Sequence, residues 1–341
     1  MFSKKTQLVK IAGAPTINNL SWAVKRNSSE IFELVCEDIP KSELAQGDVS
    51  IRIEYSSLNY KDVLSIAGKN GETKIYPQVI GIDAVGIVEH SMNSTIKVGT
   101  RVAQFGRGLG TTLMGGLSHY LNAKPEVLIE IPNSISALKA GAFGTAGLTA
   151  SACVSRILEE GIKTSAGPIL VTGAGGGVGR IALLMLSQLG YQTIASTRGA
   201  IFPGIENSQL IAPLKHSNFN LLPEKWTAVV ETLGGESLAT ALKSTRAGGL
   251  VLSVGMVESA SFSVTVYPFV LRGIKLSGIN LDQIENRKKK ELLNLVDSLI
   301  SFDTLMRITK IIEFNDVPIF LELMKVGKHT GRTVVKIQAS T

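Results

Sequence analysis

Residues 170–180 read LVTGAGGGVGR and contain five glycines within the seven residues from Gly173 to Gly179. The apolar run Ile169 to Thr172 precedes these glycines, as expected of a short buried strand. After them, apolar residues recur at helical spacing, at Val178, Ile181, Ala182, Met185, Leu186 and Leu189. At a strand-to-helix turn, unpaired N–H groups and the positive end of the helix dipole hold a pyrophosphate when no side chain blocks the backbone. The stretch therefore predicts a dinucleotide site, with a plain tight turn as the alternative.

The spacing of these glycines does not match the strict GxGxxG template, because the sixth position counted from Gly173 is Val178. Their context is more specific, because a second apolar strand at Gln192 to Ser196 completes the order strand, turn, helix, strand. Apolar strands and helical segments continue to alternate, at Ala228 to Glu231, Leu238 to Lys243 and Leu250 to Val254. This alternation predicts a doubly wound parallel sheet covered by helices.

The first third of the chain has the pattern of short antiparallel strands. Polar residues alternate there with Val49, Ile51, Ile53 and Tyr55, which is the period of a half-buried strand. The following segment is divided by Gly81, Gly86, Gly99, Gly106, Gly108, Gly110, Gly115 and Gly116. Such punctuation is typical of a compact β-barrel. We expect the final VVKI, Val334 to Ile337, to form one more strand that returns to this first domain.

Composition excludes several classes of protein. The 341 residues are 44% hydrophobic and 18% charged, which suits a large core divided between two domains. No apolar run could span a membrane and Met1 to Pro15 lacks the apolar block of a secretory signal, so we expect a cytoplasmic protein without a membrane partner. The formal charge of +7 suits anionic ligands. The basic run Arg287 to Lys290 lacks interleaved aromatic residues and begins an amphipathic segment, which favours a solvated helix over a nucleic-acid site.

The residues after the second strand indicate which dinucleotide is bound. NAD-binding folds place an acidic residue there, which binds the adenosine ribose. This chain instead has Ser196, Thr197, Arg198 and Gly199. Two hydroxyls and a guanidinium suit a ribose 2′-phosphate through charge-assisted hydrogen bonds. The position therefore predicts NADPH, with an exposed loop arginine as the alternative.

Six segments in chain order carry a resemblance to a known family: SSLNYKD (Ser56 to Asp62), GIDAVGIV (Gly81 to Val88), MGGLSHY (Met114 to Tyr120), GTAGLTA (Gly144 to Ala150), VTGAGGGVG (Val171 to Gly179) and YPFVLRG (Tyr267 to Gly273). Together they resemble the zinc-free quinone-oxidoreductase branch of the medium-chain dehydrogenase/reductases. More narrowly, the chain is similar to the bacterial NADPH-dependent acryloyl-CoA reductases, from about Val49 to Ile337.

The resemblance implies a GroES-like β-barrel catalytic domain over residues 1–141 and 308–341. It places a Rossmann NADPH-binding domain over residues 142–307, with a cleft where the two domains meet. The cofactor contacts that it implies are Tyr60, Thr145, Thr149, Gly173, Gly175, Gly176, Gly177, Val178, Ser196, Thr197, Arg198 and Met256. A role in helix packing is the alternative for Thr145 and Thr149.

Two departures concern metal binding and the wall of the active site. Zinc alcohol dehydrogenases carry a Gly-His-Glu motif where this chain has Gly81-Ile82-Asp83. No ligand spacing joins the four histidines, His90, His119, His216 and His329. We therefore expect no metal ion. Arg107 stands where the family commonly has an aromatic residue, so we expect a different active-site wall and a shifted substrate range.

The reaction that the resemblance implies is reduction of an activated carbon-carbon double bond. It requires a hydride, a group that polarises the substrate carbonyl and a proton donor. NADPH supplies the hydride. Tyr60 is the candidate proton donor because a phenol is protonated at neutral pH and can hydrogen-bond an enolate, and Asn59 or backbone N–H groups are candidates for polarising the carbonyl. The alternative is that Tyr60 only packs against the nicotinamide while water protonates the product.

Three functional hypotheses follow. The first is a reductase of acryloyl-CoA or a similar small enoyl-CoA thioester, and the second is a reductase of quinones or free enones. The third is a non-enzymatic NADPH-binding protein, which Tyr60 and the intact glycine turn disfavour. The β-branched stretch from Ser261 to Gly278 favours either pairing across a homodimer, as in this family, or an internal strand.

Overall fold

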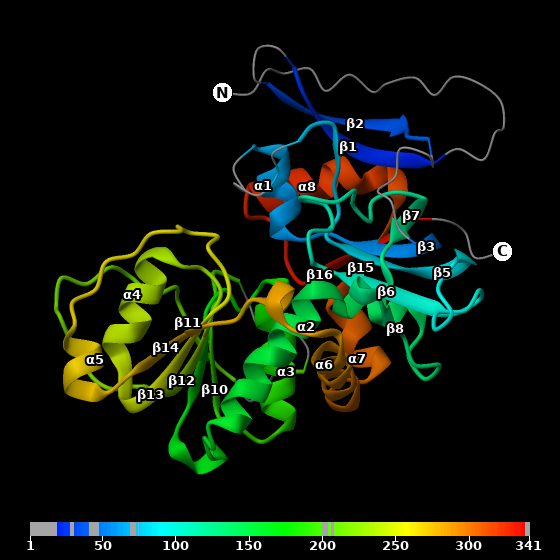
Figure 1. The fold of residues 1–341 in the computed structure, drawn as a ribbon. Coiled ribbons are helices and arrows are strands. Elements are labelled where there is room, and N and C mark those ends of the chain that lie inside the picture. The colour runs from blue at the N-terminus through cyan, green and yellow to red at the C-terminus, as the bar shows by residue number, and fades with distance from the viewer. Residues whose placement is uncertain are drawn as a thin grey trace.

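The computed structural model describes residues 19–27, 31–40, 48–68, 73, 75–199, 204–205 and 208–337. The expectation that Met1 to Pro15 holds no secretory signal lies outside these residues. Figure 1 shows two sheets on opposite sides of the molecule, with α2, α3 and α6 between them.

The predicted parallel sheet is present. In the described residues it has six strands in the order β11-β10-β9-β12-β13-β14, each parallel to its neighbours. The strands are β9 (Ile169–Val171), β10 (Thr193–Ser196), β11 (Gln209–Ile211), β12 (Trp226–Glu231), β13 (Thr245–Ser253) and β14 (Lys275–Gly278). From β9 the chain adds strands toward one edge of the sheet, β10 and then β11, and from β12 it adds strands toward the other edge, β13 and then β14. Ligands bind doubly wound sheets at such a reversal point, beyond the carboxyl ends of the strands.

The second sheet combines both ends of the chain. Over the described residues it has seven strands, in the order β15-β16-β3-β5-β6-β8 with β7 beside β3. These are β3 (Val49–Ser57), β5 (Asp83–Ser91), β6 (Arg101–Phe105), β7 (Tyr120–Ala123), β8 (Ile129–Glu130), β15 (Thr309–Glu313) and β16 (Arg332–Lys336). A further three-stranded sheet has the order β2-β1-β4 and contains β1 (Leu20–Arg26), β2 (Phe32–Asp38) and β4 (Gln78–Val79). The predicted C-terminal strand is thus β16, which pairs antiparallel with β3.

Helix α2 (Ala137–Glu159) joins the two halves. It packs on the helices α3 and α6 and also on the strands β3, β5 and β16. The helix is broken at Gly144, whose φ of 50° and ψ of −159° are not helical. A side chain is excluded there because a Cβ would lie 2.5 Å from Asp83 Oδ2. The break lets a second helical segment begin at Thr145, next to that buried carboxylate.

The remaining helices cover the sheets. They are α1 (Tyr60–Ile66), α3 (Gly177–Gln188), α4 (Gly235–Ser244), α5 (Tyr267–Arg272), α6 (Asn286–Leu299), α7 (Phe302–Arg307) and α8 (Val317–Lys325). No helix among the described residues is both long and apolar enough to cross a membrane. The domain boundaries at 141/142 and 307/308 stay predictions, although the parallel sheet lies wholly between them.

Helix α6 contains the basic run and corrects one expectation. Arg287, Lys288 and Lys290 are exposed, as predicted for a solvated helix. Lys289 is only 1% exposed, and its Nζ donates a hydrogen bond to the Phe105 carbonyl at 2.8 Å. Burial, together with repulsion from Arg107, lowers the pKa of Lys289 to about 8. The solvated-helix prediction was therefore wrong for this one lysine, which ties α6 to β6.

Candidate active site

A cavity of about 1290 Å³ connects the glycine turn with α1 and with Ile82, the residue before β5. All thirteen predicted site residues line it: Asn59, Tyr60, Thr145, Thr149, Gly173, Gly175, Gly176, Gly177, Val178, Ser196, Thr197, Arg198 and Met256. Its volume is above the usual range of about 300 to 1000 Å³ for small-molecule sites, so it is large enough for a dinucleotide together with a substrate. The positions agree with the predicted site, while the role of each residue stays a prediction.

The glycine turn follows β9 and begins α3, as predicted. Gly173 has a φ of 56°, and a Cβ there would collide with the Thr232 hydroxyl. A Cβ on Gly179 would lie 2.6 Å from the Gly173 carbonyl oxygen, so this glycine permits close packing of turn and helix. Gly176 has an ordinary φ of −84°, and its nearest Cβ neighbour would be the Gly173 oxygen at 3.3 Å. Gly173, Gly176 and Gly179 thus have different structural roles and follow the spacing GxxGxxG. This spacing is why the sequence does not match the GxGxxG template.

The fold of the turn does not require a glycine at position 176, because the φ of Gly176 is ordinary and a Cβ there would meet only the Gly173 carbonyl oxygen. Gly176 is the N-cap of α3 and offers no capping side chain, so the first N–H groups of the helix lack that partner. These N–H groups belong to residues that line the cavity. A side chain at Gly176 would occupy space beside them. The turn thus has the properties of an anion site for a pyrophosphate.

Arg198 lies beyond β10, at the same end of the cavity. It is exposed, and its Nη2 donates to the Gly327 carbonyl at 3.0 Å. A guanidinium has five N–H donors, so one backbone hydrogen bond leaves most of them for a phosphate. Thr197 accepts a hydrogen bond from the Gly199 N–H at 3.1 Å, which shapes the loop. Ser196 is only 2% exposed and donates weakly to the Ala212 carbonyl at 3.4 Å. Of the three predicted residues, Arg198 is the best placed for a 2′-phosphate.

Behind the cavity, Asp83 is fully buried and accepts hydrogen bonds on both carboxylate oxygens. Its Oδ1 accepts the N–H and the hydroxyl of Thr145 at 2.9 and 2.6 Å. Its Oδ2 accepts the Ser57 hydroxyl at 2.5 Å and Asn59 Nδ2 at 2.8 Å. Arg332 Nη2 lies 3.7 Å from the same oxygen. A buried carboxylate is stable as an anion only with such donors and a countercharge.

Arg332, at the start of β16, completes this network. It is 2% exposed, and its guanidinium donates to the Ser57 hydroxyl at 2.6 Å, the Ala142 carbonyl at 2.8 Å and Asn59 Oδ1 at 3.2 Å. The Ser57 and Arg332 positions are 275 residues apart in the sequence. No local pattern relates them, which is why the sequence did not single out Arg332 or Ser57.

The same network corrects the hypothesis for Asn59. Its Nδ2 donates to the Ser57 carbonyl at 3.1 Å and to Asp83 at 2.8 Å. Both hydrogens of the amide are thereby used, so Asn59 has no donor left to polarise a substrate carbonyl. The geometry instead supports a positioning role. Its backbone N–H also donates to Asp62 Oδ2 at 2.8 Å, and burial raises the pKa of Asp62 to about 7.

The other polar residues of the cavity differ in how their hydroxyls are used. The Thr149 hydroxyl donates to the Thr145 carbonyl at 2.8 Å. This hydrogen bond lies within α2, in agreement with the alternative that Thr149 has a role in helix packing. Thr145 donates to Asp83, and each threonine oxygen retains acceptor capacity toward a ligand amide. Tyr60 is half-buried, and its hydroxyl makes no hydrogen bond to any other described residue. Tyr60 therefore has an uncommitted donor in the cavity.

The expectation for Arg107 does not fit the structure. Its neighbours Gly106 and Gly108 line the cavity, but Arg107 is not among the lining residues. Its guanidinium donates to the backbone carbonyls of Ile284 at 3.1 Å and Glu126 at 3.4 Å. The arginine therefore braces the loop against the start of α6 and does not form the active-site wall.

Charge in the cavity favours anions. Among the described lining residues, five carry positive charge and two carry negative charge: Lys61, Arg180, Arg198, Lys328 and Arg332 against Glu258 and Asp282. His329 also lines the cavity and shares a hydrogen bond of 2.8 Å with Thr333. Burial, together with repulsion from Arg332 and Arg180, lowers the pKa of His329 to about 4. This histidine is therefore neutral at pH 7.

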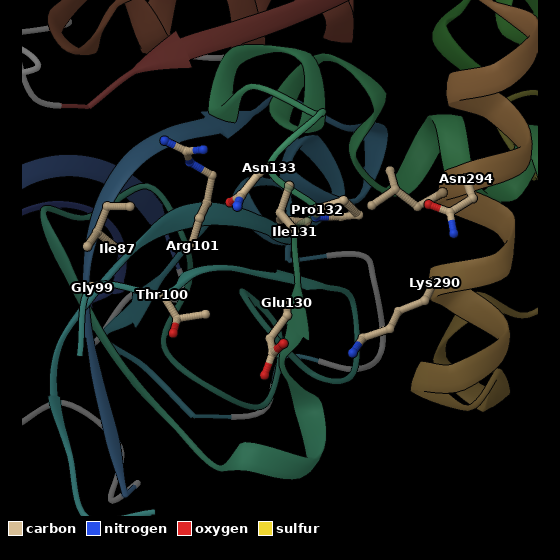
Figure 2. Close-up of a pocket in the computed structure, with 11 residues that line it drawn as sticks. Ile87, Gly99, Thr100, Arg101, Glu130, Ile131, Pro132, Asn133, Lys290 and Asn294 are labelled. Atoms are coloured by element: carbon tan, nitrogen blue, oxygen red, sulfur yellow. The ribbon is translucent and has the colours of Figure 1, made fainter. Parts of the chain in front are cut away.

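A second cavity of about 570 Å³ lies between the seven-stranded sheet and α6 (Figure 2). Its lining residues include Arg101, Glu130, Lys290 and Asn294, and none of the predicted site residues is among them. Within the described ranges, no three His, Cys, Asp or Glu side chains converge as metal ligands would.

Comparisons with known proteins match this geometry. Residues 45–133 match the alcohol dehydrogenase GroES-like domain. The chain is 33% identical over 308 residues to the probable acrylyl-CoA reductase AcuI of Escherichia coli strain K12, covering 88% of this chain and 94% of that protein. It is 32% identical over 322 residues to the putative quinone oxidoreductase YhfP of Bacillus subtilis strain 168, covering 91% and 95%.

A solved structure agrees over nearly the whole chain. The crystal structure of E. coli K-12 YhdH with bound NADPH superposes with a TM-score of 0.89 at 30% identity, covering 93% of this chain and 100% of that one. The two sheets and the joining helix therefore follow an arrangement already seen in a solved structure that binds NADPH. Identity, coverage and fold together show that this chain belongs to the quinone-oxidoreductase branch of the medium-chain dehydrogenase/reductase family of oxidoreductases.

Proposed function

We propose that this protein is an NADPH-dependent reductase of an activated carbon-carbon double bond, with acryloyl-CoA or a similar small enoyl thioester as substrate. The observation that carries the proposal is that one cavity joins the anion-binding turn at Gly176, the guanidinium of Arg198 and the uncommitted hydroxyl of Tyr60. The similarity to a probable acrylyl-CoA reductase supports the choice of substrate.

The residues of the cavity fit the cofactor. The turn from Gly175 to Val178 would hold the pyrophosphate, Arg198 would bind the 2′-phosphate, and Thr145 and Thr149 would accept hydrogen bonds near the nicotinamide. When bound, NADPH supplies a hydride to the β-carbon of the substrate. Asp83 and Arg332 hold Thr145 and Asn59 in place from behind.

Tyr60 has the proposed proton-transfer role. Its O–H can hydrogen-bond the enolate oxygen that develops and then transfer its proton to the α-carbon, after which the phenolate takes a proton from water, while Asn59 fixes the start of α1. Proton delivery by water is the alternative, in which Tyr60 only packs. The variant Tyr60→Phe, described below, distinguishes the two.

A second candidate is reduction of quinones or free enones, which the similarity to a putative quinone oxidoreductase favours. The deciding experiment follows NADPH oxidation with acryloyl-CoA, a simple enone and a quinone in parallel. Acryloyl-CoA with the highest kcat/KM supports the proposal, and a clear preference for quinone or enone overturns it. NADPH binding without turnover of any of the three would favour the non-enzymatic alternative.

We also propose a homodimer formed through β14. Residues 261–278 contain α5 and β14. Strand β14 is the outer strand of the parallel sheet among the described residues, so the alternative of an internal strand does not fit. Exposed apolar side chains gather on these elements, at Tyr267, Val270, Leu271 and Leu276. Sedimentation of the protein and of Val270→Asp tests this proposal, since a monomeric parent would contradict it. The expected cytoplasmic location stays a prediction.

A further inference from the structure

We propose that Lys61 exchanges its ion pair with Asp282 for an ion pair with a phosphate of the CoA arm, so that Lys61 selects phosphate-bearing thioesters over small enones. The inference rests on the proposed function and identifies a residue for its substrate specificity.

Lys61 follows Tyr60 on α1 and lines the same cavity. Its Nζ lies 3.4 Å from Asp282 Oδ2. Asp282 belongs to the 3₁₀ helix η4 (Leu281–Gln283), which connects the parallel sheet to α6. The ion pair therefore spans the cavity between the two halves of the molecule, next to the proposed proton donor.

Asp282 keeps its place without Lys61. Its Oδ1 accepts the Arg107 N–H at 2.6 Å, and its own N–H donates to Asn280 Oδ1 at 3.0 Å. A Cβ on Gly106 would collide with the same Oδ1, so the loop fits closely around this carboxylate. Lys61 can consequently leave without disordering Asp282.

The other cations of the cavity have different positions or partners. Arg332 is buried in the Asp83 network. Arg198 and Lys328 lie together at Gly327, the end assigned to the 2′-phosphate. Arg180 donates to the Gly175 carbonyl at 3.1 Å in the glycine turn. Lys61 is thus the lining cation that α1 contributes beside Tyr60.

The surroundings of Lys61 suit an acyl carrier arm. Leu64, Leu109 and Leu281 line this part of the cavity and offer apolar contact to a pantetheine chain. The side chains of Lys61 and Asp282 are 37% and 29% exposed, and ion pairs this accessible to water are weak. A phosphate offers more charge and several acceptor oxygens, so exchange of partners is favourable. A free enone has no group for which Lys61 would leave Asp282.

The test compares Lys61→Met with the parent on acryloyl-CoA and on acryloyl-pantetheine, which lacks the phosphates. We expect kcat/KM for acryloyl-CoA to fall by about 10- to 100-fold, mainly through KM, as on loss of a hydrogen bond to a charged group. The value for acryloyl-pantetheine should change by less than about 3-fold, because the removed contact is absent from that substrate. Free CoA, titrated calorimetrically, should bind Lys61→Met more weakly by the same factor.

Three further variants test whether the effect of Lys61→Met comes from the lost positive charge or from a change in the structure of the cavity. Lys61→Arg should retain the preference for CoA, because it can still bind phosphate. Asp282→Asn should lower the KM for acryloyl-CoA, because a competing carboxylate is removed while an acceptor for Arg107 remains. Lys290→Met, which removes an exposed lysine outside this cavity, should match the parent.

Equal losses on the two thioesters, or no loss on either, would overturn the assignment of Lys61 to phosphate. Failure of the proposed function has a different signature, namely no reduction of either thioester by the parent. In that case the binding of free CoA alone decides the inference, and CoA binding that is absent or insensitive to Lys61→Met refutes it.

Discussion

Asp83 accepts two hydrogen bonds from Thr145, one from its N–H at 2.9 Å and one from its hydroxyl at 2.6 Å. Asp83 begins β5 of the seven-stranded sheet, whereas Thr145 follows the break in α2, the helix that packs on α3. A buried carboxylate in one half of the protein thus fixes the segment of α2 that lines the cavity beside the glycine turn. Loss of its charge should affect both stability and cofactor placement.

Asp83→Asn should lower the free energy of unfolding by about 3 to 5 kcal/mol, because it leaves the buried Arg332 without a countercharge and places an amide among donors. Urea unfolding measures the change. The control Glu159→Gln removes an exposed pairing with Lys288 and should cost less than about 1 kcal/mol. Similar losses in the two variants would show that the network is not a stabilising centre.

Arg198→Ala should weaken NADPH binding by about 1.5 to 3 kcal/mol and leave NADH binding nearly unchanged, because only NADPH carries the 2′-phosphate. Calorimetric titration of both cofactors checks this. Arg287→Ala, which removes an exposed arginine outside the cavity, is the matched control. Equal weakening for the two cofactors would contradict the assignment.

Gly176→Val should abolish binding of either cofactor while the protein still unfolds near the parent's midpoint. The backbone at Gly176 accepts an ordinary residue, and the closest contact of a Cβ is the Gly173 oxygen at 3.3 Å. Gly179→Val, by contrast, should destabilise the fold, because its Cβ would lie 2.6 Å from the same oxygen. A stable Gly176→Val variant that binds NADPH tightly would exclude this turn as the pyrophosphate site.

Tyr60→Phe should lower kcat by about 10²- to 10⁴-fold if the hydroxyl donates the proton, with little change in NADPH affinity. The ring would still pack against the buried residues between α1 and the seven-stranded sheet, so stability should change little. Single-turnover reduction of acryloyl-CoA at saturating NADPH isolates the chemical step. A variant within a few-fold of the parent would leave water as the proton source.

His329 should make stability depend on pH. Its pKa is lowered from 6.5 to about 4 in the folded protein, so the unfolded chain binds the proton more readily. The stability that the neutral ring contributes is therefore present above pH 6.5 and is lost as the pH falls toward 4, by at most about 3 kcal/mol. His329→Gln should flatten this slope in urea unfolding between pH 7 and 4, whereas replacing the exposed His90 by Gln should not. Parallel slopes for His329→Gln and the parent would refute the shift.

Local patterns in the sequence determined the architecture and most of the candidate site. The alternation of apolar strands with helical segments predicted the parallel sheet, because the spacing of apolar residues within each segment indicates whether that segment is a strand or a helix. The glycine turn and the loop at Arg198 follow consecutive strands, and the carboxyl ends of adjacent parallel strands meet at one edge. Their placement in one cavity was therefore predictable from chain order. The resemblance extended the prediction to Tyr60 and Met256.

Only the tertiary structure determined the partners behind the site. Ser57, Asp83 and Arg332 come from separate strands, and no periodicity encodes which buried charges will meet. The sequence also does not distinguish Lys289 from the other three basic residues between Arg287 and Lys290, because its burial depends on contact with the Phe105 carbonyl of β6. Asn59 retained its predicted position but not its predicted role, because its amide hydrogens are used by neighbours. Local sequence determines the spacing of apolar residues and the geometry of turns. Whether a hydrogen-bond donor or a charged group already has a partner depends on segments that folding brings together from distant parts of the chain.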